Sequence, residues 1–119
     1  MLLSELQINS RNELFEQLEL MSSKDEQLDY HAKVPIAYVS DELFWGWASA
    51  YQDIKELDWF DGIYTSQELV ILKSLDVHVK RIRLPLPKHL PTIEEFIETP
   101  EWKELAKVAK DALNALRAL

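Results

Sequence analysis

Apolar residues recur at steps of three and four along much of the chain, a spacing that places side chains on one face of an α-helix. The pattern is clearest between residues 100 and 117, where lysines and other polar residues fill the opposite side. The apolar stripe there consists of Trp102, Leu105, Ala106, Ala109, Ala112, Leu113 and Leu116. It predicts an amphipathic helix packed on a core.

Short hydroxyl motifs indicate where helices begin. Ser10, Thr65 and Thr92 are each followed three residues later by glutamate, which is the capping-box pattern. Thr99 precedes a proline that suits the first helical position, and Ser40 precedes two acids that suit the positive end of a helix. We therefore expect helices over about residues 11–21, 66–83 and 93–98, one from residue 100, and another from residue 41. A serine at 23 predicts a further short piece toward residue 30.

The expected middle helix, residues 66–83, has apolar positions on two sides. Its main face is joined by a second stripe of Val70, Val77 and Leu84, so we expect the helix to be sandwiched in the core or at an interface. The fold predicted is all-α, a compact bundle of four to six helices in one domain over residues 1–119. The alternative is α+β, with a small two-stranded element formed by residues 34–39 and 77–84.

Composition narrows the classes of partner. The chain has a formal charge of −8 and no cysteine, which excludes disulfides and thiolate metal sites. No apolar run reaches the ~20 residues of a membrane span, and the first ten residues lack the basic region of a signal peptide, so we expect a cytoplasmic protein. An acidic surface repels nucleic acid and anionic lipid and favours a basic protein as partner.

The charge is unevenly distributed. Residues 1–72 hold fourteen acids and four bases, whereas residues 73–89 hold five bases and one acid. We expect that basic block to pair with nearby acidic helices or with the acidic face of a second copy, and not with nucleic acid.

Eight of the twelve aromatic residues lie between positions 38 and 64. Most should be core, but Trp45 and the pair Trp59–Phe60 are candidates for exposure. Carboxylates surround the pair, and rings within an acidic rim suit a basic partner, because the acids steer it and the rings hold it. The predicted partner site is Trp45, Glu56, Asp58, Trp59, Phe60 and Asp61.

Motifs for catalysis or cofactors are not found in the sequence. The three histidines lack zinc-helix spacing, and the two glycines form neither a phosphate-binding loop nor a nucleophile elbow. Asp61, Gly62 and Glu68 match three positions of a calcium loop, but Leu57 and Trp59 stand where two oxygen ligands are needed. We therefore predict no catalytic residue, no metal and no cofactor.

These observations predict a non-enzymatic module that binds a basic protein, of the physical type of small acidic bacterial immunity, inhibitor or chaperone proteins. Two alternatives remain. One is a helical pocket, lined by the same rings, for a small apolar ligand. The other is a structural homodimer formed through the helix over residues 66–83.

Overall fold

The computed structural model describes residues 2–119 and is built from helices. They are α1 (Glu5–Ser22), α2 (Lys24–Lys33), α3 (Val39–Trp47), the π-helical turn η1 (Ala48–Gln52), the 3-10 turn η2 (Asp58–Phe60), α4 (Ser66–Arg83), α5 (Ile93–Phe96) and α6 (Pro100–Arg117). The all-α prediction is confirmed, with six α-helices and no strand in residues 2–119. The two-stranded alternative is wrong, because residues 34–38 form a turn before α3 and residues 77–83 lie within α4.

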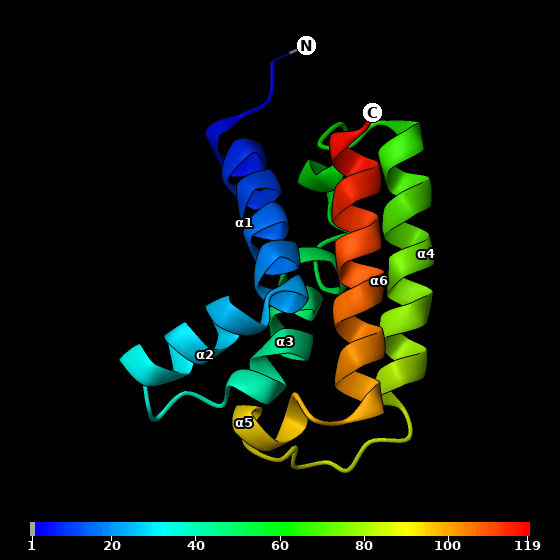
Figure 1. The fold of residues 1–119 in the computed structure, drawn as a ribbon. Helices are drawn as coiled ribbons and strands as arrows, with labels where there is room; N and C mark the ends of the chain where they lie inside the picture. The colour runs from blue at the N-terminus through cyan, green and yellow to red at the C-terminus, as the bar shows by residue number, and fades with distance from the viewer. Residues whose placement is uncertain (1) are drawn as a thin grey trace.

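Helix α6 lies between α1 and α4, and these three helices run side by side along the molecule (Figure 1). Helix α3 packs against α1, and the short α5 closes the end of the molecule near the start of α3. Buried side chains from all of these elements form one core. Its fully enclosed members include Leu14, Leu18, Met21, Leu43, Trp47, Leu72, Ile93, Phe96 and Leu105.

The capping motifs locate four of the helix starts correctly. Each capping hydroxyl accepts a hydrogen bond from the backbone N–H three residues later, at Ser23, Thr65, Thr92 and Thr99. The prediction at Ser10 is wrong: α1 begins at Glu5, and Ser4 forms the capping box with Gln7. The Ser40 prediction is also wrong. Its hydroxyl donates to the carbonyl of Pro91 (2.7 Å), across to the segment before α5.

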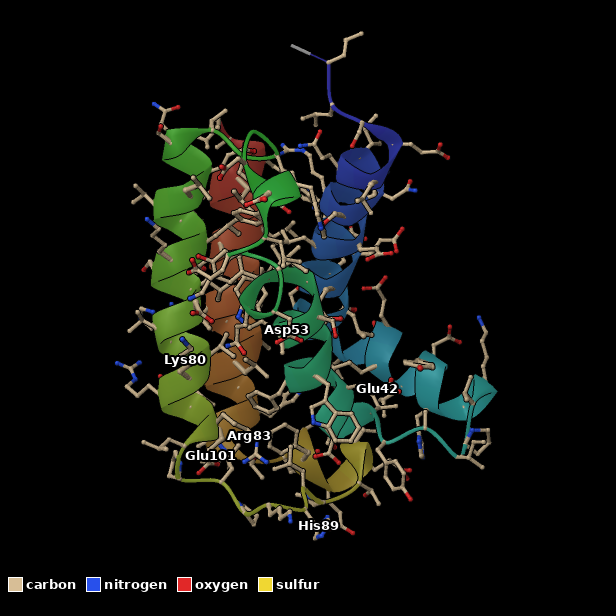
Figure 2. The ribbon with its side chains drawn as sticks, turned by 180° about the vertical axis from the view of Figure 1, so that it is seen from behind. Glu42, Asp53, Lys80, Arg83, His89 and Glu101 are labelled. Carbon is tan, nitrogen blue, oxygen red and sulfur yellow. The ribbon has the colours of Figure 1, made fainter. Side chains whose placement is uncertain are left out.

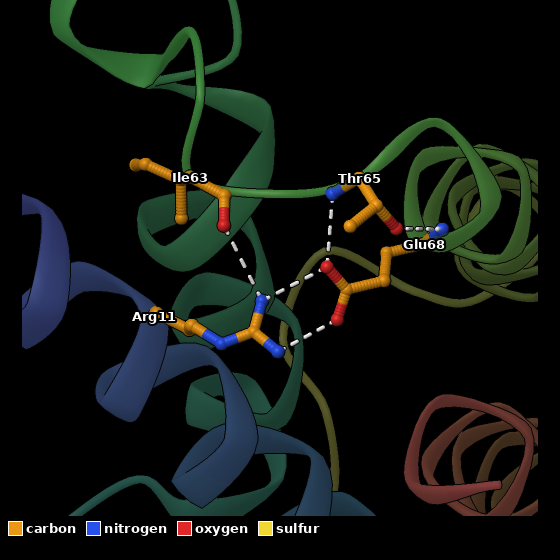
Figure 3. A network of polar contacts seen from close by, with 4 residues as sticks. All are labelled: Arg11, Ile63, Thr65 and Glu68. Carbon is orange, nitrogen blue, oxygen red and sulfur yellow. Dashed lines mark hydrogen bonds and ion pairs between the residues drawn. The ribbon is translucent and has the colours of Figure 1, made fainter. Parts of the chain in front are cut away.

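An ion pair joins α1 to the start of α4 (Figure 3). Arg11 donates two hydrogen bonds to the carboxylate of Glu68, at 3.1 and 2.6 Å, and a third to the carbonyl of Ile63 at 3.3 Å. Glu68 also accepts from the N–H of Thr65 (2.9 Å), so one carboxylate caps α4 and binds α1. The contact fixes the connection that follows η2.

Helices α1 and α3 approach closely at a glycine. A Cβ on Gly46 would lie 2.2 Å from Oε1 of Gln17. That glutamine side chain crosses α3 and donates to the carbonyl of Leu43 (3.1 Å). The missing side chain of Gly46 therefore lets Gln17 bind the backbone of α3.

Helix α4 has the bounds and the two apolar sides that the sequence predicts. Leu72, Leu75, Val79 and Ile82 are buried against the rest of the bundle. The second stripe is exposed: Val70, Val77 and Leu84 retain 69%, 65% and 87% of their accessible surface.

Candidate functional site

The structure divides the predicted partner site between two places along α1. Gln7 donates to the carbonyls of Trp59 (2.9 Å) and Asp61 (3.1 Å), so η2 lies beside the N-terminal part of α1. Gln17 contacts α3 near Trp45. Ten helical residues separate the two glutamines, a rise of about 15 Å. Trp45 and the Trp59–Phe60 pair therefore do not form one surface.

The three predicted aromatic anchors differ in exposure. Trp45 retains 60% of its accessible surface, Trp59 is half-buried, and Phe60 retains only 7%. The prediction of Phe60 as an exposed anchor is wrong, because its ring packs between Tyr51 and Tyr64, at centroid distances of 6.2 and 5.6 Å. Of these three predicted anchors, only Trp45 presents a large, open aromatic surface.

Trp45 stands on a polar ridge that we call the Trp45 ridge, formed by Glu42, Trp45, Ser49 and Asp53. Their spacing of three or four residues places them on the outer side of α3 and η1, and Figure 2 shows Glu42 and Asp53 along this side. Among residues 2–119, neither acid has an ion pair with a lysine or arginine. The ridge thus combines a ring with uncompensated negative charge.

A groove of about 570 Å³ lies between this ridge and α4. Its floor and walls include Phe44, Gln52, Val79, Lys80, Arg83 and Leu84. The guanidinium of Arg83 lies 5.6 Å from the centroid of the Phe44 ring. Figure 2 shows Lys80 and Arg83 on α4, across from the two ridge acids. The groove therefore has an apolar surface and a basic edge on α4, and the acids of the Trp45 ridge lie beyond its other side.

Three of the predicted residues, Glu56, Phe60 and Asp61, meet in a second cleft of about 490 Å³. Lys55 and Lys73 line it as well, so the acids face bases there and form no purely acidic rim. The remaining predicted acid, Asp58, is exposed on η2 and is not among the residues that line the cleft.

The buried carboxylate of Asp76 lies below this cleft and was not predicted as a site residue. It accepts hydrogen bonds from Nε1 of Trp47 (2.9 Å) and Nε2 of Gln52 (2.7 Å), and Nζ of Lys80 lies 3.1 Å away. Burial opposes ionisation of Asp76, but the hydrogen bonds from Gln52, Trp47 and Lys80 hold its pKa below the usual value. An acidic residue at a helical core position was the available signal in the sequence.

The π-helical turn makes this network possible. In η1 the N–H of Asp53 donates to the carbonyl of Ala48, five residues back, at 2.8 Å. The wider turn carries Gln52 to Asp76 while Tyr51 stacks on Trp47, with ring centroids 5.0 Å apart. Such turns occur often at functional sites. Here the turn locks the end of the Trp45 ridge to α4.

The three histidines lie in different parts of the fold. His31 pairs with Glu94 (2.9 Å), His78 lies beside the carbonyl of Ser74, and His89 is exposed in the linker before α5. Within residues 2–119, no three histidine, aspartate or glutamate side chains are grouped as metal ligands would be. Asp76 is held as a carboxylate by donors on α3, η1 and α4, which is a structural arrangement.

Comparison with models of protein families, with curated proteins and with solved structures gives no match to this chain. The fold defines an all-α protein. None of the helices in residues 2–119 has the length and apolar character needed to cross a bilayer.

Proposed function

We propose that the protein is a non-enzymatic binding domain that recognises a basic surface of a partner protein through the Trp45 ridge. The observation that carries this proposal is the 60% exposure of Trp45 between acids without ion-pair partners among the described residues. Tryptophan is enriched among the residues that dominate binding energy at protein interfaces. Neighbouring carboxylates would steer a cationic partner toward it.

The rigidity of the ridge supports the same function. Gln17 binds the backbone of α3, and Gln52 binds Asp76 at the other end of the ridge. A surface whose backbone is already fixed loses little conformational entropy when a partner binds. Four other rings of residues 38–64 pack on one another beneath the surface, namely Trp47, Tyr51, Phe60 and Tyr64. Tyr38, just before α3, is 71% exposed.

The proposal is tested with a labelled amphipathic peptide of lysine and leucine, and with its glutamate–leucine counterpart, by fluorescence anisotropy. We expect the cationic peptide to bind and the anionic one to bind far more weakly. Trp45→Ala should weaken cationic binding about 30-fold, since truncating a dominant aromatic residue costs roughly 2 kcal/mol. Val70→Ala, at an exposed position on α4, is the apolar control and should bind as the wild type does.

General attraction to an acidic protein is separated from site binding by two variants of equal net charge. Asp53→Lys removes an acid from the ridge, whereas Glu13→Lys removes an exposed acid from α1. The proposal requires a clearly larger loss of affinity in Asp53→Lys. Equal losses in the two variants, or an unchanged affinity in Trp45→Ala, would contradict it.

A further inference from the structure

On the face seen in Figure 2, two bases of α4 lie on one side and the acids of the Trp45 ridge on the other, and Glu101 at the start of α6 is seen near Arg83. Lys80 and Arg83 stand on α4 at one side of the groove, and Asp53 and Glu42 stand on the ridge at the other. In this view Lys80 and Asp53 lie farther from α5 than Arg83 and Glu42 do. The order of the bases on one side therefore matches the order of the acids on the other.

Such a face is complementary to itself. A twofold axis running in the face, along α4 and between the two charged sides, exchanges left for right and keeps height unchanged. Each basic edge then meets the acidic ridge of the other copy, which is the condition for an isologous interface.

We propose that a second copy of this chain docks on this face, with the basic edge of each copy against the Trp45 ridge of the other. Lys80 faces Asp53 of the second copy and Arg83 faces its Glu42. Trp45 of each copy packs against Lys80 and Arg83 of the other, and the two grooves face each other across the axis. Leu84, 87% exposed at the end of α4, is covered by the same contact.

The internal contacts of the basic residues leave them able to make these pairs. Arg83 is oriented by its contacts with Phe44 and with the carbonyls of Leu86 and Lys88, none of which carries negative charge. The side chain of Lys80 is 58% exposed although it also contacts Asp76. Because each charge pair occurs twice under the twofold axis, association should weaken as salt concentration rises.

This inference rests on the ridge identified above as the binding surface, but it names a different occupant and is tested without any peptide. A foreign basic partner would compete with the second copy for the ridge. A monomer that binds the cationic peptide would overturn the self-docking and leave the proposed function standing. A dimer that does not bind the cationic peptide would support the self-docking and contradict the proposed function.

The test is sedimentation velocity of the full chain up to about 200 μM in low and high salt. We expect a dimer at about 50 mM salt that dissociates at least partly at about 500 mM. Trp45→Ala leaves every charge in place and should raise the dissociation constant about ten-fold or more. Val70→Ala should leave it unchanged.

A charge exchange gives the sharpest outcome. Arg83→Glu alone opposes acid to acid at the interface, and Glu42→Lys alone opposes base to base, so each variant should be mainly monomeric. In an equal mixture of the two variants, a heterodimer should form. One of its ion pairs then joins the two substituted residues, with the charges reversed, and the other joins the two original residues. Circular dichroism of each variant confirms that it is folded before the mixture is measured.

A matched control uses Lys107→Glu and Glu13→Lys, which change the same charges at exposed positions on α6 and α1. Each should dimerise as the wild type does. The proposal is overturned if the wild type remains monomeric at about 200 μM and 50 mM salt, or if the mixture of Arg83→Glu and Glu42→Lys stays monomeric. It is also overturned if the control variants dissociate to the same extent.

Discussion

Replacing Arg11 by methionine should destabilise the fold strongly at neutral pH and much less in acid. In the wild type, the guanidinium of Arg11 donates two hydrogen bonds to Glu68, whose side chain is only 8% exposed. Methionine keeps much of the length of the side chain but supplies no donor. The carboxylate of Glu68 is then still buried, but the N–H of Thr65 is its one remaining backbone donor.

The size of the effect follows from these contacts. Hydrogen bonds to charged groups contribute about 1.5–3 kcal/mol each. Arg11 is 32% exposed, so solvent screening reduces that contribution. We expect a loss of about 2–3 kcal/mol at pH 7, equivalent to a fall in melting temperature of roughly 10 °C.

The dependence on pH identifies the cause. The hydrogen bond from Arg11 is the main reason that the pKa of Glu68 is lowered; burial opposes it, and Thr65 adds to it. A lowered pKa stabilises the fold above the unfolded value of about 4.3, and this stability is lost as pH falls through the folded pKa. Without Arg11 the pKa of Glu68 should rise, because burial is then less opposed. The variant therefore loses less stability in acid, and the gap to the wild type narrows from pH 7 to pH 3.

The assay is urea unfolding at several pH values, with Arg117→Met as control. Arg117 pairs with Glu19 at the surface, with side chains 52% and 41% exposed, so its removal should cost less than about 1 kcal/mol. A gap between Arg11→Met and the wild type that stays constant from pH 7 to pH 3 would refute the reasoning. So would equal losses in the two arginine variants.

Three further substitutions test single contacts by thermal unfolding. Gly46→Ala should destabilise the fold because the new Cβ displaces Gln17. In a Gln17→Ala background the same change should stabilise the fold by about 0.5–1 kcal/mol, because alanine has the better helix propensity. A change in stability of the same sign in both backgrounds would contradict this prediction. Gly62→Ala should cost about 1–2 kcal/mol, because Gly62 has φ of 89°, and an unchanged melting temperature would count against the observed backbone. Trp102→Phe should cost about 1–3 kcal/mol, because Nε1 of Trp102 is the donor to Oε1 of the buried Gln27, and a neutral result would show that water replaces it.

The helices that the sequence predicted best are those whose ends carry their own stereochemical signals. Thr65 with Glu68, and Thr99 before a proline, locate the starts of α4 and α6 because the caps are satisfied by local hydrogen bonds. The start of α1 was missed because Ser4 with Gln7 also forms a capping box. Glutamine and glutamate both reach back to the cap, so local chemistry offered two starts and only packing of the longer helix selects one.

The candidate site was less predictable because exposure depends on tertiary contacts. Trp45 and Phe60 both stand among acids in the sequence, yet one is open and the other lies between Tyr51 and Tyr64. The π-helical turn that leads Gln52 to Asp76 adds to the difficulty, since one extra residue in a turn changes which side chains face α4.

The sequence showed that acids and bases are concentrated in different segments, but it did not show which single charges pair in the fold. The basic block was expected to be neutralised by acidic helices, and Arg81 does pair with Glu104 on α6 (2.8 Å). Arg83 instead bonds to backbone carbonyls, and among residues 2–119 the ridge acids have no ion pair with lysine or arginine. The two signs therefore stay apart on one face, across an apolar groove. Separated charges of this kind cost the monomer little because water solvates both, and they favour association with whichever surface brings the opposite sign to each edge.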